Sequence, residues 1–338
     1  MKFDFCIGNP PYQESVKEDS ENKTYFSPVY NKFMEAAYEI ADKVELIHPA
    51  RFLFNAGATP KEWNNQMLND NHFKVLSYEP NSGNVFSNTE IKGGIVVSYR
   101  DQTKEFEPIR VFTKYDELNA ILKKVQAIST TSLASIIAST MSYGVTDLFS
   151  KENPNLVNRL RTSAFTVLSD VFFDEIPDDG NGYIKMAGLK KLKRIRMYVR
   201  KDYIKDKDGT LDKYTVLMPA ASGSGKFGET LSPTEIAEPG VGFLQTYIGI
   251  GCFDDELPAM NVQKYIKCKM SRAMLGILKI TQHCTGQAWE YVPIQDFTSK
   301  SDIDWTKSIH EIDQQLYAKY GLSQEEIDFI EKNVKEMA

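Results

Sequence analysis

The residues best suited to chemistry stand near the start of the sequence, where an apolar segment, Phe3 to Ile7, runs into Asn9-Pro10-Pro11-Tyr12. The two prolines fix the backbone and donate no hydrogen bonds, so the Asn9 side chain and the Pro10 carbonyl can point outward together. Two adjacent acceptors can receive both protons of an exocyclic amino group and leave its lone pair free to attack an electrophilic carbon. Tyr12 can stack on the ring that carries the amine. This chemistry suits N6 of an adenine extruded from duplex DNA.

Asn9-Pro10-Pro11-Tyr12 after an apolar strand resembles the catalytic motif of S-adenosylmethionine-dependent amino-methyltransferases, especially N6-adenine DNA methyltransferases of Eco57I-like restriction-modification systems. Further similar segments lie at 44–53, 85–86, 91–94, 223–229, 279–283 and 302–305. The resemblance implies that Asn9, Pro10, Pro11 and Tyr12 are catalytic, and that Phe86 is a candidate for the second face of the base pocket. It also implies S-adenosylmethionine as the cofactor and double-stranded DNA as the partner.

The sequence departs from this family at the cofactor site. The glycine-rich loop that precedes the motif in the family has no counterpart in the eight residues before Asn9, so the cofactor-binding residues stay unassigned. Tyr247 to Gly251 has a similar glycine pattern, but Asp254-Asp255-Glu256 and Pro258 occupy the place where a helix should begin. We expect a strand of the later domain there.

The missing cofactor strands have a consequence for Phe3 to Ile7, which is expected at a sheet edge with unpaired backbone groups and apolar side chains on both faces. Three outcomes are open. A partner polypeptide supplies the cofactor half, self-association covers the strand, or the chain is an inactive truncated methylase.

Composition limits the classes of protein to which the chain can belong. Its 338 residues are 42% hydrophobic and 25% charged, which excludes disorder, a collagen-like fibre and a disulfide scaffold. A net charge of -6 excludes binding of nucleic acid by overall basicity. The four cysteines are scattered without the spacing of metal ligands, which predicts free thiols and no metal site. The sequence shows no signal peptide and no apolar run of membrane length, which predicts a cytoplasmic protein without membrane association.

Three regions are expected. Residues 1–120 alternate apolar runs with helical patterns, which predicts an α/β domain with a largely parallel sheet. The resemblance implies that this domain is the C-terminal half of a catalytic domain, with a partial Rossmann-like methyltransferase sheet. Residues 121–300 are rich in turn signals and predict a separate, loop-rich domain with a strand at Phe243 to Ile250 and a helix from about Met260 to Ile280. The resemblance implies that this is an α+β target-recognition, DNA-binding domain. Residues 301–338 predict a helical hairpin, with Gly321 as a helix stop and Ser323 and Glu326 as a capping box.

A locally basic stretch runs from Lys185 to Lys207, with ten basic and two acidic side chains. It is the footprint expected for phosphate contact, and a solvated basic face is the alternative. The candidate DNA-binding residues are Lys190, Lys191, Lys193, Arg194, Arg196, Arg200 and Lys201, together with Lys226. The segment Ser222 to Lys226 looks like a phosphate-binding loop, but Ala220 and Phe227 break that pattern, so a flexible recognition loop is favoured.

Other patterns carry less weight. Asp70 with Glu90-Ile91-Lys92 loosely fits a metal nuclease, although such triplets are common by chance. The four histidines are far apart and are expected to be structural. Two functions compete with DNA methylation: recognition of DNA by a non-catalytic subunit, and methylation of a glutamine side chain in a protein.

Overall fold

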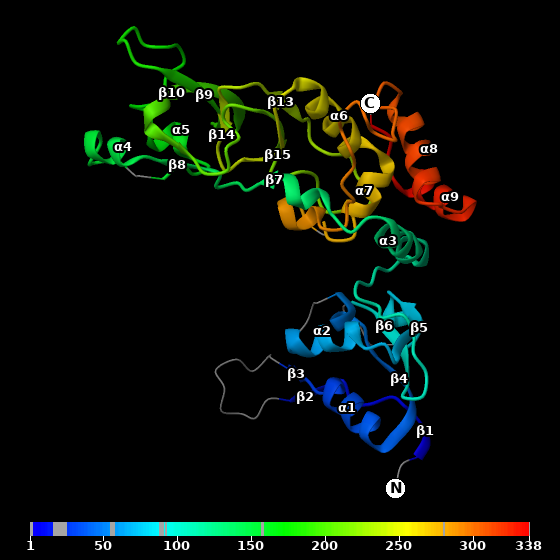
Figure 1. The fold of residues 1–338 in the computed structure, drawn as a ribbon. Helices are drawn as coiled ribbons and strands as arrows, with labels where there is room; N and C mark the ends of the chain where they lie inside the picture. Colours follow the sequence, from blue (N-terminus) through cyan, green and yellow to red (C-terminus); the bar gives the residue numbers. More distant parts are fainter. Residues whose placement is uncertain are drawn as a thin grey trace. The chain divides into compact units, whose positions relative to one another are not determined.

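The computed structural model describes residues 3–15, 26–54, 58–87, 91, 93–156, 159–279 and 281–337 (Figure 1). The chain divides into two compact units, Met1–Asn119 and Ala120–Ala338. Each unit is described by itself below.

Unit 1 is built on a four-stranded sheet in the order β1-β4-β6-β5. Its strands are β1 (Phe3–Gly8), β4 (Ala41–Pro49), β5 (Phe73–Glu79) and β6 (Ile95–Asp101). β1 and β4 are parallel, whereas β6 is antiparallel to both β4 and β5. The prediction of a largely parallel sheet is met in part, because β1, β4 and β5 run in one direction and β6 runs against them. β5 is followed by the 3₁₀ turn η2 (Ser82–Asn84) and no described crossover helix, so the chain returns antiparallel and enters between β4 and β5.

The core of unit 1 lies between one face of this sheet and two helices, α1 (Tyr30–Ile40) and α2 (Lys61–Asn69). Buried Val44 and Leu46 alternate along β4 with half-buried Lys43 and Glu45, so the strand presents an apolar face to the helices. The remaining elements are the 3₁₀ turn η1 (Arg51–Phe54) and a small hairpin of β2 (Gln13–Ser15) and β3 (Phe26–Pro28).

β1 lies at the edge of the sheet within the described residues, as the sequence predicts. The expectation of apolar side chains on both faces is only partly met. Phe3, Phe5 and Ile7 share one face and are 57%, 55% and 73% exposed. On the other face Cys6 packs against the core and Asp4 is exposed. The uncovered apolar surface of β1 is thus confined to one face.

Unit 2 contains three sheets, in the orders β10-β9-β14, β11-β8 and β13-β12-β15-β7. Its strands are β7 (Ile137–Ala138), β8 (Tyr143–Val145), β9 (Tyr183–Lys190), β10 (Lys193–Arg200), β11 (Ile204–Asp206), β12 (Tyr214–Pro219), β13 (Glu235–Ala237), β14 (Val241–Phe243) and β15 (Tyr247–Phe253). Phe165, Met186, Met197 and Phe243 belong to one buried cluster that joins the strands to the short helix α5 (Ala164–Val167). The predicted strand from Phe243 to Ile250 is in fact parts of β14 and β15.

The other helices of unit 2 are α4 (Asp147–Glu152), α6 (Glu256–Lys267), α7 (Lys269–Leu275), α8 (Ile309–Lys319) and α9 (Gln324–Asn333), with α3 (Asp116–Ile128) at its start. Three further 3₁₀ turns are η3 (Leu133–Ile136), η4 (Lys201–Tyr203) and η5 (Gly286–Trp289). The single helix predicted from Met260 to Ile280 is wrong, because Cys268 is extended (ψ 144°) and separates α6 from α7. The Asp313 carboxylate accepts hydrogen bonds from the Lys269 and Met270 amides, both at 2.9 Å, and so stabilises this break.

The helical pair near the end of the sequence is confirmed. Ser323 and Glu326 form the predicted capping box of α9, and Gly321 has the left-handed φ of 61° expected at the end of α8. Lys124 forms an ion pair with Glu326 at 2.7 Å, which ties α3 to α9. In the part of the chain that the structure describes, no helix is both long and apolar enough to cross a bilayer.

Candidate active site and nucleic-acid interface

Asn9 follows the last residue of β1, at the carboxyl end of the parallel β1-β4 pair. Its side chain is exposed, and the neighbouring Pro10 and Pro11 lead the chain away from the sheet towards Tyr12. The Val29 amide, just before α1, donates a hydrogen bond to the Tyr12 carbonyl at 3.1 Å. The motif is thus held at both ends, by the sheet register and by the start of α1.

Tyr12 and Phe86 come together, although 73 residues separate them in the sequence. The Phe86 amide donates to the Ser82 carbonyl at 2.8 Å, which places the ring just after η2. The two ring centroids are 6.3 Å apart and the planes meet at 64°, an edge-on contact. Two aromatic rings sandwich a base only when they are parallel, so this conformation brings the two residues together without forming a base sandwich.

The Tyr12 hydroxyl is a buried group without a hydrogen bond of regular geometry. Burial raises the pKa of Tyr12 to about 12, and the nearby Asn9 side chain lowers it only in part. The hydroxyl is therefore a neutral hydrogen-bond donor at neutral pH, with the Asn9 side chain as its polar neighbour. A cavity of about 40 Å³, lined also by Tyr30 and Arg51, lies beside Tyr12. It is the size of one or a few water molecules and too small for a base.

The described residues near Asn9 do not fit S-adenosylmethionine, because none of them forms a glycine-rich turn from a strand into a helix. The alternative pattern at Tyr247 to Gly251 forms strand β15, as predicted. A side chain at Gly249 would lie 2.8 Å from Phe243 and from Thr215, so this glycine permits close packing. Cofactor residues stay unassigned.

His48 is structural, as predicted, because it is fully buried and bonded within the core. Its Nε2 lies 2.7 Å from Ser98 Oγ, its ring stacks on Tyr30, and burial lowers its pKa to about 4. Asp70 of the nuclease-like pattern forms a 2.7 Å ion pair with Arg100, and its other members Glu90 and Lys92 lie outside the described residues. No group of three or more His, Cys, Asp or Glu side chains is placed to hold a metal ion in the described ranges.

The basic stretch of unit 2 is a β-hairpin. β9 and β10 pair in register from Tyr183 with Arg200 to Lys190 with Lys193, and Lys191 and Leu192 form the turn. Lys191 and Lys193 are exposed and form no ion pair among the described residues, while Lys190 Nζ lies 3.7 Å from Met197 Sδ. The charges at this end of the hairpin are available to a partner.

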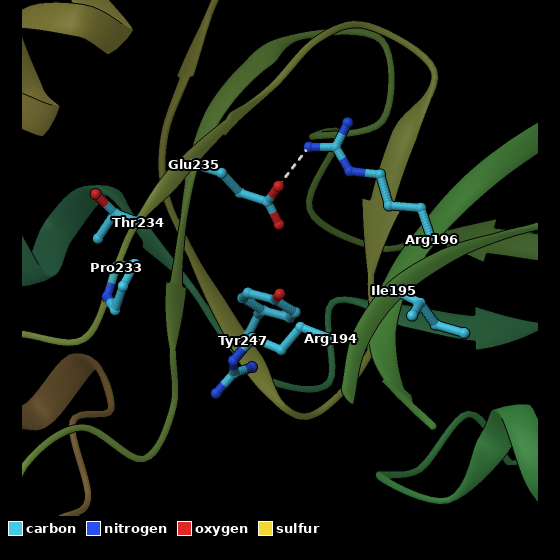
Figure 2. A pocket seen from close by; sticks show the side chains of 7 residues that line it. All are labelled: Arg194, Ile195, Arg196, Pro233, Thr234, Glu235 and Tyr247. Atoms are coloured by element: carbon cyan, nitrogen blue, oxygen red, sulfur yellow. Dashed lines mark hydrogen bonds and ion pairs between the residues drawn. The ribbon is translucent and has the colours of Figure 1, made fainter. Parts of the chain in front are cut away.

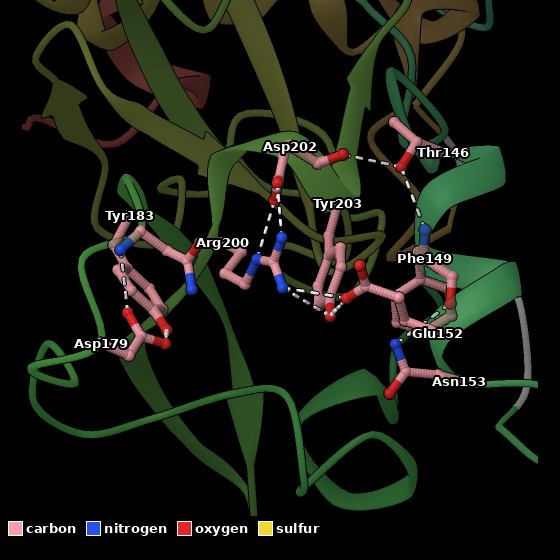
Figure 3. Close-up of polar contacts among 10 residues, drawn as sticks. Thr146, Phe149, Glu152, Asn153, Asp179, Tyr183, Arg200, Asp202 and Tyr203 are labelled. Carbon is pink, nitrogen blue, oxygen red and sulfur yellow. Dashed lines mark hydrogen bonds and ion pairs between the residues drawn. The ribbon is translucent and has the colours of Figure 1, made fainter.

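At the open end of the hairpin, by contrast, the acidic side chains of Asp202 and Glu152 lie beside Arg200 (Figure 3). Arg200 binds both carboxylate oxygens of Asp202, at 3.0 and 2.6 Å, and also bonds Glu152 at 2.9 Å and the Tyr203 hydroxyl at 3.0 Å. Its side chain is only 19% exposed. Lys201 lies 3.3 Å from Asp212. Arg200 and Lys201 thus contribute to internal contacts, and a phosphate would have to compete for them.

Arg194 and Arg196 line a cavity of about 470 Å³ at the side of β10 (Figure 2). Glu235 forms an ion pair with Arg196 at 2.7 Å, and the Arg194 guanidinium lies over the Tyr247 ring, 4.8 Å from its centroid. Burial raises the pKa of Tyr247, Glu235 raises it further, and Arg194 opposes the rise. Two guanidinium groups are therefore held in place beside a cavity large enough for a nucleobase.

The segment that looks like a phosphate-binding loop holds a carboxylate of its own. The Ser224 and Gly225 amides donate to Glu229 at 2.8 and 2.7 Å, and Lys279 Nζ lies 2.5 Å from the same carboxylate. Burial by itself would raise the pKa of Glu229, but these donors lower it to about 2. The Ser224 and Gly225 amides are thus occupied by Glu229, and Lys226 is exposed.

Sequence reasoning missed the acidic partners Glu152 and Glu235, the turn residue Leu192 and the contribution of Tyr247 to the cavity. Glu152 and Glu235 lie 48 and 39 residues from their arginines, so no local window links them. One signal was present for the hairpin, since in the segment after Lys191-Leu192 basic residues alternate with Ile195, Met197 and Val199. The pair lacks the Asn or Gly that usually marks such a turn.

Comparison with known proteins supports the resemblance at Asn9 to Tyr12. Residues 1–86 match the family of Eco57I restriction-modification methylases. This match confirms the predicted resemblance for that segment. A search of curated proteins finds no match.

Two solved structures are similar at low identity. The type IIG restriction endonuclease BpuSI is 10% identical, with a TM-score of 0.33, over 90% of this chain and 48% of that protein. The type IIL restriction-modification enzyme MmeI, in complex with DNA, is 9% identical, with a TM-score of 0.36, over 97% of this chain and 56% of that protein. This chain spans about half the length of either structure, and neither TM-score is high enough to define its fold.

Proposed function

We propose that this chain contains the catalytic motif and the DNA-recognition region of a restriction-modification methyltransferase that acts on N6 of adenine. The observation that carries the proposal is the placement of Asn9 at the end of β1, with Tyr12 three residues on and the Phe86 ring beside it. The match of residues 1–86 to a methylase family supports the same reading.

In this proposal the Asn9 side chain and the Pro10 carbonyl accept the two amino protons of an extruded adenine, while Tyr12 stacks on its ring. Acceptors placed where positive charge develops on nitrogen stabilise the transition state. The contact between Tyr12 and Phe86 opens to admit the base. Bound S-adenosylmethionine would supply the electrophilic methyl group.

A partner polypeptide supplies the cofactor-binding half in the same proposal. Two observations support it: the described residues near Asn9 do not fit the cofactor, and no described strand pairs with the outer side of β1, where Phe3, Phe5 and Ile7 are exposed. Self-association over β1 is the other way to cover this edge. If the purified chain bound S-adenosylmethionine at micromolar affinity in calorimetry, the need for a partner would be refuted.

The test is a nucleoside analysis of DNA from cells that lack their own adenine methylation. The chain is expressed with and without the polypeptide encoded beside it, and methylated nucleosides are measured by mass spectrometry. We expect N6-methyladenine only when the partner is present. The Asn9→Ala variant should yield roughly a hundredfold less N6-methyladenine than the unchanged chain. Asn65→Ala, on the exposed side of α2, is the matched control. Methylation of cytosine would contradict the choice of adenine.

Recognition of DNA without catalysis is the second candidate, and the lack of a cofactor cradle among the described residues favours it. In that case DNA binding persists while no partner restores methylation. Methylation of a protein glutamine is less well supported, because the exposed lysines at the β9-β10 turn suit a polyanion. An assay of methyl transfer to protein in the presence of added DNA distinguishes this third candidate from the first two.

A further inference from the structure

The turn between β9 and β10 is built from residues that disfavour its backbone. Lys191 and Leu192 have φ values of 48° and 64°, in the left-handed region where asparagine and glycine are the usual residues. Side chains with a Cβ are strained in this region. Strain of this kind persists at segments that bind ligands more often than elsewhere. The stability of the hairpin therefore does not explain the choice of residues.

Leu192 is also the most exposed large apolar side chain among the described residues, at 90%. Its neighbours Lys190, Lys191 and Lys193 are basic, and no acidic residue occurs in either strand of the hairpin. An apolar group at the tip of a basic ribbon adds nothing to folding. Its surroundings are complementary to a partner with negative charge outside and apolar surface within.

We propose that Leu192 is a wedge that inserts between stacked base pairs of duplex DNA while the lysines beside it contact the phosphates. This inference rests on the proposed function, because it takes DNA as the ligand. Apolar side chains on basic elements unstack and kink a base step in this way. Duplex DNA has phosphates on the outside and an apolar stack of bases within. The lysines beside Leu192 match the phosphates, and the Leu192 side chain matches the base stack.

The wedge has a use in a protein that extrudes a base. A base that leaves the stack leaves apolar surface exposed to water, and an apolar side chain can cover that surface. A leucine has no donor or acceptor to read base edges, so it acts at any sequence. We therefore expect Leu192 to change the affinity for unstacked DNA and not the choice of site.

The test compares two duplexes of the same mixed sequence, one intact and one with a central abasic site that is already unstacked. Binding of the full chain is measured by fluorescence anisotropy over a range of salt concentrations. We expect the unchanged chain to prefer the abasic duplex about tenfold. Leu192→Ala should lose most of this preference and keep the salt slope, because every lysine remains. Leu192→Met should keep the preference.

Ile176→Ala is the matched control, because Ile176 is an exposed apolar residue of the same unit outside the hairpin. It should behave like the unchanged chain, and circular dichroism should show that all variants are folded. A preference that survives in Leu192→Ala, or that is absent from the unchanged chain, overturns the wedge and leaves the phosphate contacts standing. Absence of DNA binding by the unchanged chain overturns the wedge together with the DNA partner of the proposed function.

Loss of methylation in cells has no bearing on the wedge if the abasic preference is present, so the two proposals can fail separately. Binding to vesicles of anionic phospholipid that depends on Leu192, without preference for abasic DNA, would assign the tip to a membrane surface and refute the DNA wedge.

Discussion

The two ends of the β9-β10 hairpin carry similar charge in opposite surroundings. Lys191 and Lys193 at the turn form no ion pair among the described residues, whereas Arg200 at the open end is bound by Asp202 and Glu152. In the sequence these residues belong to one basic run. The comparison shows that part of such a run is exposed and without acidic partners among the described residues, whereas part is bound in internal contacts, and only the three-dimensional partners separate the two.

The largest expected effect tests the free end. Lys191→Glu with Lys193→Glu should weaken binding to duplex DNA roughly a hundredfold at low salt and flatten the salt dependence, because two phosphate contacts become repulsive. Lys201→Glu alone reverses a lysine that already pairs with Asp212 and should cost less than about threefold, whereas Lys191→Glu alone should cost about tenfold. Equal losses in an anisotropy titration would remove the distinction between the two ends.

Substitution of Arg200, at the open end of the hairpin, should change the free energy of unfolding. Arg200→Met should lower the free energy of unfolding by about 2 kcal/mol, because it removes the Arg200 hydrogen bonds to Glu152, Asp202 and the Tyr203 hydroxyl and leaves Glu152 with the Tyr203 hydroxyl as its donor. Arg196→Met removes a single, more exposed ion pair and should cost less than about 1 kcal/mol. Urea unfolding measures both. Arg200→Met should leave the salt slope of DNA binding unchanged.

The loop at Glu229 repeats the contrast on a smaller scale, since Lys279 is bonded to Glu229 and Lys226 is exposed. The pKa of Glu229 is lowered to about 2 from its usual 4.5, so its contribution is complete above about pH 4.5 and is lost as the pH falls towards 2. We expect a loss of about 1 kcal/mol between pH 5 and pH 3.5.

Thermal unfolding at several pH values measures this slope. Glu229→Gln should remove the Glu229 contribution to it, whereas Lys226→Ala should keep it. A slope that Glu229→Gln leaves unchanged would show that other carboxylates cause it.

The smallest effect concerns the turn. Lys191→Asn with Leu192→Gly places the usual residues in the left-handed conformation and should raise the free energy of unfolding by about 0.5–1 kcal/mol. The same change should weaken binding to abasic DNA. A melting temperature that falls would mean that the two φ values are not strained.

Local sequence signals predicted much of the fold. The strand before Asn9 and the capping box at Ser323 follow from periodicity and capping, which are local properties. The antiparallel direction of β6 was missed, because a run of apolar residues shows that a strand exists and not which neighbours it pairs with. The division of α6 from α7 was missed because it also depends on a distant residue: Asp313, which bonds the start of α7, lies 44 residues after Lys269.

The sequence predicted which residues form the candidate site but not how their side chains are arranged. Asn9 to Tyr12 could be named because the four residues are contiguous, and Phe86 because a second similar segment contains it. The edge-on angle between the rings of Tyr12 and Phe86 is set by packing around η2 and has no local signal. The basic stretch was recognised by its charge, but the acidic residues that occupy Arg200 and Arg196 come from other elements.

The open edge of β1 couples assembly to chemistry. No strand of the described residues pairs with its outer side, and β1 leads directly into Asn9, so a strand that pairs there would restrict the residue proposed to hold the amine. Thermodynamic linkage makes such an effect mutual. Any factor by which the added strand tightens adenine binding at Asn9 is also the factor by which bound adenine tightens the added strand.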